Sequence, residues 1–136
     1  MNFSDFNGRV DTHLLLLKTP VKTVDQAEEA SNAFNLFRSE LAYYYYEAEK
    51  AVGIFKGLEK AVYAEAFSSV SLDETGKKLA VNAREYEADR NPKYQELLVD
   101  KAEAEAMMSL IEVHLDIFKD AVISFRHKAE RLGRNF

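Results

Sequence analysis

A regular spacing of apolar residues in the first half of the chain is the feature that most restricts its fold. Steps of three and four residues, taken alternately from Ala27 to Val62, meet an apolar or aromatic side chain at each of eleven positions. The average period of 3.5 residues is that of the buried seam of a coiled coil. Thr23, followed three residues later by Gln26, has the pattern of a capping box. We therefore expect a helix over residues 24–67 with its stripe packed on another helix.

A second stretch with the same rhythm occupies the last third of the chain. From Tyr94 to Leu132 the same steps meet apolar side chains at every position except Lys101. Gly133 follows the last apolar residue and suits the end of a helix over residues 92–132. The apolar face of this helix is too wide for one partner, so we expect it to contact at least two. Beside the seam it also carries Leu98, Met107, Leu110, Ile117 and Ile123.

The segment between the two long helices has the composition of a loop and a short helix. Serines, acids and one glycine mark residues 68–77 as a solvated loop. Residues 78–90 predict a short helix. Asn91 and Pro92 then supply a cap and a proline at the first position of the next helix, where its missing N–H costs nothing.

The first 20 residues predict a short amphipathic helix. Ser4 or Asp5 is its candidate cap, and Thr19 with Pro20 closes it. The longest apolar run lies nearby, at residues 14–17, and is too short for a membrane span or a signal-peptide core. We therefore expect a cytoplasmic protein, and one domain over residues 1–136.

These patterns define the expected fold class as all-α: a long antiparallel helical hairpin with coiled-coil-like packing, which is oligomeric. A two-layer hairpin leaves the extra apolar flank of the second long helix in water, and burial of that flank favours self-association. The residues expected at the oligomer interface are Tyr44, Leu98, Met107, Leu110, Ile117 and Phe118.

Four consecutive tyrosines occupy residues 43–46. Successive residues of a helix point around most of its circumference, so the four side chains cannot form a single ligand box. Tyr44 falls on the seam and the others flank it. Packing or oligomer contact is the favoured interpretation, and stacking on nucleotide bases is the alternative.

The chemistry required by common enzymes is missing from the sequence. There are no cysteines, which excludes disulfides, thiolate zinc sites and a cysteine nucleophile. No metalloprotease, phosphate-loop or dinucleotide-binding motif occurs, and no glutamate stands three residues before a histidine as di-iron bundles require. We expect no enzymatic activity, no metal and no cofactor.

Charge is distributed unevenly along a chain whose net charge is −5. That value argues against a protein that coats duplex DNA, because such affinity comes from neutralised phosphates. Basic residues gather in two places, residues 77–93 and residues 121–136. The second group includes Arg126, Lys128 and Arg131, which equally suit the C-terminal end of a helix dipole.

The order of elements over residues 45–132, with a Leu-Leu-x-Asp-Lys element at residues 97–101, resembles the UvsY-like recombination mediator family of tailed bacteriophages. After that element the resemblance continues through Leu110, Leu115, Phe118, Ala121 and Arg126. It implies an all-helical homo-oligomer, possible as a ring, that binds single-stranded DNA in phage recombination and repair. Such mediators assist the loading of a RecA-type recombinase onto DNA covered by single-strand-binding protein.

The family's DNA-contacting stretch lies late in the first long helix, where this chain has Lys56 and Lys60. These lysines are four residues apart and share a helix face, so they can follow successive phosphates. Glu49 and Glu59 dilute the patch, and the 126–131 group is its rival. The full set of candidate nucleic-acid-binding residues is Lys50, Lys56, Lys60, Lys77, Lys78 and Arg84. The alternative function is a helical adaptor or phage assembly protein that acts through protein–protein contacts without nucleic acid.

Overall fold

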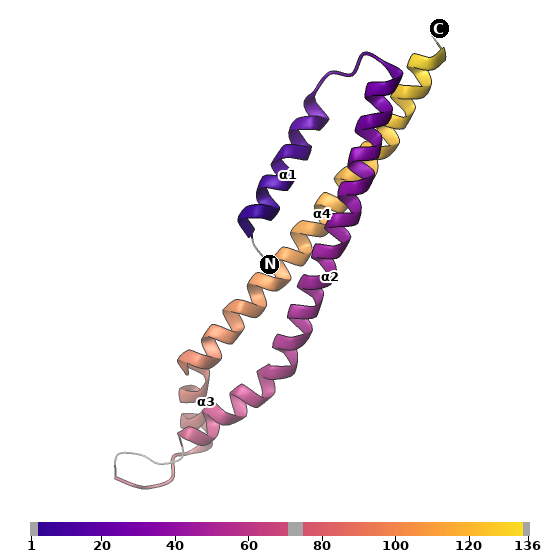
Figure 1. The fold of residues 1–136 in the computed structure, drawn as a ribbon. Coiled ribbons are helices and arrows are strands. Elements are labelled where there is room, and N and C mark those ends of the chain that lie inside the picture. The colour runs from indigo at the N-terminus through magenta and orange to yellow at the C-terminus, as the bar shows by residue number, and fades with distance from the viewer. Residues whose placement is uncertain (1–2, 71–74, 135–136) are drawn as a thin grey trace. The chain divides into compact units, whose positions relative to one another are not determined.

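The computed structural model describes residues 3–70 and 75–134, and these fold into four helices with no strand among them (Figure 1). The all-α prediction is confirmed. The helices are α1 (Phe3–Lys18), α2 (Val24–Ser69), α3 (Val81–Asp89) and α4 (Pro92–Arg134).

The start of α2 lies at the predicted residue, and its cap differs from the prediction in one bond. The Gln26 backbone N–H donates to Thr23 Oγ1 at 3.1 Å, as a capping box requires. The Gln26 side chain, however, accepts its hydrogen bond from the Lys22 N–H at 2.9 Å and not from that of Thr23. Both hydrogen bonds of a capping box are therefore present at the start of α2, but the second one reaches Lys22, one residue before the expected Thr23.

Helix α4 begins at the predicted residue, but it ends later than predicted. Asn91 Oδ1 accepts hydrogen bonds from the backbone N–H groups of Lys93 at 3.0 Å and Tyr94 at 3.3 Å. The cap therefore satisfies two donors that have no partner inside the helix. Gly133 was expected just past the helix, but α4 continues to Arg134 and takes Gly133 into its last turn.

The shorter elements differ from the predicted ones by a few residues. Helix α1 begins at Phe3, so Ser4 and Asp5 lie inside its first turn and neither precedes it as a cap. Helix α3 begins at Val81, three residues later than predicted, after Ala80 in an extended conformation. Part of the predicted loop, residues 71–74, lies outside the described residues. Gly76 in the described part has φ +81°, a conformation that favours glycine.

Contacts divide the chain into two compact units, which are described separately below. Unit 1 comprises Met1–Glu47 and Met108–Phe136, and unit 2 comprises Ala48–Met107. The sequence-based expectation of one domain for the whole chain stays a prediction.

In unit 1, α2 and α4 pack through phenylalanine rings. Phe34 lies 5.7 Å from Phe118 and 5.1 Å from Phe125, measured between ring centroids. Further along α2, Phe37 meets Phe118 edge-on at 5.0 Å. At the other end of the contact the Tyr45 hydroxyl donates to the Glu112 carboxylate at 3.0 Å. Residue numbers rise along α2 as those of their α4 partners fall, so the segments in unit 1 are antiparallel.

Helix α1 completes unit 1 by covering both of the other helices. Phe6 is fully buried and meets Tyr44 of α2 edge-on at 5.5 Å and His114 of α4 at 6.3 Å. His13 stacks flat on Phe37 with ring centroids 3.8 Å apart. The broad apolar face of α4 therefore contacts two helices in unit 1, as its width predicted.

Unit 2 is a thinner antiparallel arrangement of α2 and α4 segments with α3 beside them. Tyr63 of α2 meets Tyr94 of α4 at 5.1 Å. A loose ion pair joins Lys93 Nζ to Glu65 at 3.6 Å, and both side chains are mostly exposed. Arg84 of α3 lies 4.8 Å above the Phe67 ring. Rings, ion pairs and small side chains therefore replace the phenylalanine core of unit 1.

The predicted α2 seam fails at one position within unit 2. Ala48 is buried and Ala51, Phe55 and Val62 are half-buried, as expected, but Leu58 is 45% exposed. The inward position next to Leu58 is held by Glu59, which pairs with Lys101 of α4. Lys101 is the one position of the predicted α4 stripe that is not apolar. It pairs with Glu59 because a part-buried ammonium group requires a partner of opposite charge.

Candidate nucleic-acid interface

Lys56 and Lys60 lie one turn apart on an exposed face of α2 in unit 2, as predicted. Neither has a hydrogen-bond or ion-pair partner among the described residues. Lys50 is also exposed, but six residues separate it from Lys56, so these two side chains project from different faces of the helix. The structure thus brings together one pair of the predicted lysines.

The acid between these lysines is turned away from them. Lys101 Nζ donates a hydrogen bond of 2.8 Å to the Glu59 carboxylate, and the side chains of the pair are 21% and 31% exposed respectively. The hydrogen bond from Lys101 to Glu59 raises the pKa of Lys101 above its usual value. Glu59 therefore neutralises a cation of unit 2 and does not dilute the lysine pair. Glu49 remains exposed nearby.

The three basic residues after the loop divide into exposed and packed side chains. Lys77 and Lys78 are exposed. Arg84 is half-buried, with its guanidinium over the Phe67 ring and its Nε buried without a hydrogen-bond partner. Cation–π contact of this kind stabilises the packing of α3. Arg84 is therefore placed as a packing residue of α3, and its contact with a nucleic acid stays a prediction.

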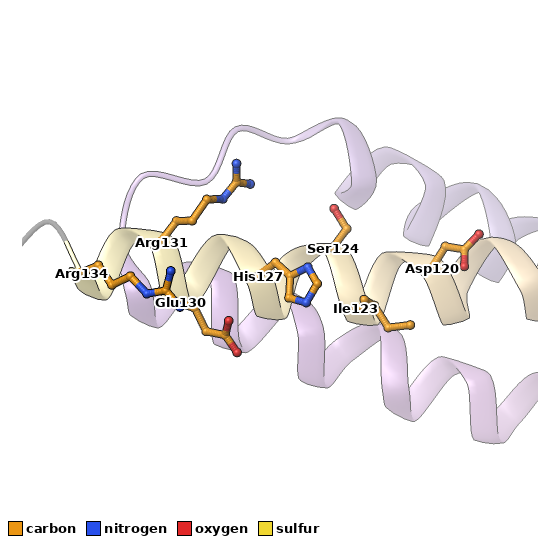
Figure 2. A pocket seen from close by; sticks show the side chains of 7 residues that line it. All are labelled: Asp120, Ile123, Ser124, His127, Glu130, Arg131 and Arg134. Carbon is orange, nitrogen blue, oxygen red and sulfur yellow. The ribbon is translucent and has the colours of Figure 1, made fainter.

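The rival basic surface on α4 carries charges of both signs. Arg131 and Arg134 line a hollow of about 670 Å³ together with Glu130 and Asp120. Figure 2 shows these side chains along α4. The other residues that line this hollow are Ile123, Ser124 and His127. The cations are thus interspersed with carboxylates along this face.

The two other predicted cations of that region face elsewhere. Arg126 lines a second hollow of about 350 Å³ that it shares with Glu28 of α2. Lys128 Nζ lies 4.1 Å from the centroid of the Phe125 ring and packs against it. The rival cations therefore do not form one continuous basic surface.

The residues predicted at an oligomer interface differ in how deeply their side chains are buried. Met107 is 2% exposed, so the inference that its apolar surface remains in water is wrong. Phe118 is fully buried. The helix contacts already described use that surface. Tyr44, Leu98 and Ile117 are half-buried, and Leu110 is 39% exposed.

His114 of α4 is half-buried within unit 1. Burial lowers its pKa, an effect that Asp11 of α1 partly opposes. Its Nδ1 atom is buried without a hydrogen-bond partner. His114 lies against Phe6 and Phe118, a setting that suits a packing histidine. Within the described ranges, no three histidine, aspartate or glutamate side chains are placed to hold a metal ion.

Two features of these surfaces escaped the sequence analysis. The pairing of Glu59 with Lys101 was missed, although the break at Lys101 was the signal that a polar partner was needed. The burial of Tyr45 was also missed: Tyr44 lies on the predicted seam, but Tyr45 is half-buried with it, while Tyr43 and Tyr46 are 62% and 60% exposed. The two exposed tyrosines are three residues apart and therefore lie on the same face of the helix.

The fold and these surfaces define an all-helical protein with a phenylalanine-rich unit and a unit that carries an open lysine pair. Comparison with protein-family models, curated proteins and solved structures finds no significant match to this chain. No helix of the described part is long and apolar enough to cross a membrane.

Proposed function

We propose that this protein is a non-enzymatic recombination mediator that binds single-stranded DNA and assists the loading of a recombinase in phage DNA recombination and repair. The observation that carries the DNA-binding part is the exposed pair of Lys56 and Lys60. Neither has a partner in the described part of the chain, while Glu59 is held by Lys101. The mediator role is supported by the family resemblance. The proposed partners are a RecA-type recombinase, single-strand-binding protein and further copies of this chain.

A single helix face with two lysines is a modest site for a polyanion. Each lysine–phosphate contact with a single strand contributes about 0.7 to the slope of log affinity against log salt. An oligomer repeats the pair, and linked weak contacts act together through a high effective concentration. Self-association therefore allows a chain of net charge −5 to bind a nucleic acid.

The test is binding of an unstructured oligonucleotide to the parent and to the Lys56→Ala/Lys60→Ala variant at several salt concentrations. We expect weaker binding by the variant and a slope flatter by about 1.4 for two lost contacts per protomer engaged. A matched control is Lys18→Ala/Lys22→Ala, which removes the same charge from two exposed lysines of unit 1. Equal binding by parent and Lys56/Lys60 variant, or no binding by the parent at low salt, would refute the proposal.

A helical adaptor that binds other proteins is the second candidate function. It is favoured by large apolar side chains left exposed on the two long helices, among them Leu36 at 70% and Val113 at 56%. Exposed apolar surface of this kind marks interaction sites when it is contiguous. This function replaces the first if the parent fails to bind the oligonucleotide.

A further inference from the structure

The outer face of α4 in unit 1 carries acids and bases in two blocks. Asp116 and Asp120 lie one turn apart, and Arg131 and Arg134 follow about three turns later, with Ile123, which is 45% exposed, between the blocks. Residues three, four or eight apart share a helix face, so these five side chains project to the same side of α4. The four charged side chains are exposed and have no hydrogen bond or ion pair in the described part of the chain. Figure 2 shows the part of this face from Asp120 to Arg134.

The other charged residues of this stretch lie at the edges of the face or have partners in unit 1. Glu112 accepts a hydrogen bond from a tyrosine of α2, and the Lys128 ammonium group lies over a phenylalanine ring. Lys119 stands roughly 60–100° around the helix from the two aspartates. Glu130, the one carboxylate within the basic block, is at the edge of the face and also lines the hollow that Arg126 shares with α2. The face therefore keeps its acids near one end and its bases near the other.

This grouping of charges leaves the two aspartates without a stabilising contact. Like charges four residues apart on a helix repel each other, and Asp116 and Asp120 have this spacing. The arginines lie in the last turn of α4, where they complement the helix dipole, but the aspartates lie in the middle of the helix. A stabilising partner is a surface that presents bases opposite the acids and acids opposite the bases. The same face of a second copy, turned end to end, has that order of charges.

We infer that this face of α4 binds the same face of a second copy of the chain, with the two helices antiparallel. The inference rests on the self-association in the proposed function and assigns a surface to it. In a two-fold contact each residue meets a partner as far beyond the axis as it lies before it. With the axis between residues 123 and 124, Asp116 of each copy lies opposite Arg131 of the other. Asp120 lies opposite His127 in the same register, and the two Ile123 side chains meet near the axis.

The order of charges also selects the direction and the strength of this contact. A parallel pair in register would bring acids against acids and bases against bases, which is unfavourable. The antiparallel overlap from residue 113 to residue 134 extends for roughly 33 Å. Exposed ion pairs are individually weak and are screened by salt. The contact should therefore give a weak dimer whose affinity is highest at low salt.

The first test measures self-association by sedimentation at low salt after reversal of the charges. Asp116→Arg and Arg131→Asp should each weaken the parental dimer by about tenfold or more, because each change replaces two ion pairs by two like-charge contacts. An equal mixture of the two variants should associate as the parent does, since one chain supplies bases at both positions and the other supplies acids. The matched control is Glu103→Arg, which makes the same change of charge at an exposed residue of α4 in unit 2 and should leave the dimer unchanged. Circular dichroism should show parental helix content for every variant, because the altered side chains are exposed.

The second test measures the direction of the pair and uses the fact that the chain has no cysteine. Under mild oxidation Ile123→Cys should form a disulfide-linked dimer, because the two copies of this position lie beside the axis. Val113→Cys should not, because its two copies lie roughly 30 Å apart in the antiparallel pair. A linked dimer of Val113→Cys, or none of Ile123→Cys, would contradict the antiparallel contact.

Sedimentation and oligonucleotide binding separate this inference from the proposed function. A parent that stays monomeric at high concentration and low salt would overturn the inference. So would a dimer that the single charge reversals leave unchanged, or one that the mixture of variants fails to restore. These results do not bear on Lys56 and Lys60, which oligonucleotide binding tests. A parent that dimerises as expected but binds no oligonucleotide would refute the proposed function and support this surface.

Discussion

Units 1 and 2 share the helices α2 and α4 but are stabilised in different ways. All of the largest fully buried side chains belong to unit 1: Phe6, Phe34, Phe37, Leu41, Ile111, Phe118 and Phe125. Unit 2 buries Val52, Ala66, Ala88, Leu97 and Met107, and places the Glu59–Lys101 pair in its seam. Burial of large apolar side chains is the main source of stability, so the free energy of unfolding should be concentrated in unit 1.

This difference indicates how one pair of helices can combine a fixed core with an open charged surface. In unit 1 a third helix covers α2 and α4, and the histidines and phenylalanines between them are largely enclosed. In unit 2 no phenylalanine is fully buried among the described residues, and the α2 surface keeps glycines and free lysines. The unit with the weaker core is the one that carries the proposed lysine site.

The largest expected effect comes from removing a ring from the unit 1 core. Phe118→Ala should lower the free energy of unfolding by about 3–5 kcal/mol, because Phe118 is fully buried among four other rings. Leu97→Ala in unit 2 should cost about 2 kcal/mol, at the low end for leucine, since its surroundings are more open. Urea denaturation measures both values, and a greater loss for Leu97→Ala would reverse the comparison.

A smaller effect is expected from the ion pair in the unit 2 seam. Glu59→Leu leaves the Lys101 ammonium part-buried without a partner and should destabilise unit 2 by roughly 1 kcal/mol. The double variant Glu59→Leu/Lys101→Leu restores an apolar seam and should be neutral or stabilising. Thermal denaturation measures the stability of both variants. A double variant that is less stable than Glu59→Leu would contradict the expectation that an apolar seam can replace the ion pair.

The pH dependence of unit 1 should follow from His114. Burial lowers its pKa, so the folded state binds fewer protons than the unfolded state, whose histidine titrates near 6.5. Stability is therefore complete above that value and falls as the pH decreases through 6.5 toward the lowered pKa. The His114→Phe variant should lack this loss, as measured by denaturation at pH 7.5 and pH 5.5. An identical loss in the variant would assign the pH dependence to other groups.

The smallest expected effect is a gain in unit 2. A Cβ built on Gly53 or Gly57 meets no atom of the chain within 4 Å. Gly53→Ala and Gly57→Ala should each stabilise α2 by roughly 0.5–1 kcal/mol, because alanine loses less backbone entropy in a helix. Amide hydrogen exchange along residues 48–69 reports the change. A loss of stability at either site would show that another backbone approaches it in an assembly.

The sequence was most informative where structure depends on neighbouring residues. The start of α2 and the Asn91 cap of α4 were predictable because their bonds form within a few residues. The end of α4 was not, since Gly133 is compatible with both a final turn and a terminator.

Features that depend on contacts between residues far apart in the sequence were harder to predict. Two registers, one through Leu58 and one through Glu59, fit the α2 sequence, and Lys101, 42 residues away, selects the second. For the candidate site, the shared face of Lys56 and Lys60 follows from the helical period. The disposition of Glu59 and the burial of Met107 depend on tertiary contacts that periodicity does not contain.

Chemical acetylation of lysines, read by mass spectrometry with and without a saturating thymidine oligomer, tests the central claim most directly. Lys119 and Lys128 of α4 serve as internal controls in the same sample, since they lie outside the proposed site. We predict that the oligomer protects Lys56 and Lys60 and leaves the reactivity of Lys119 and Lys128 unchanged. Unchanged reactivity of Lys56 and Lys60 under conditions where the oligomer is bound would contradict the account.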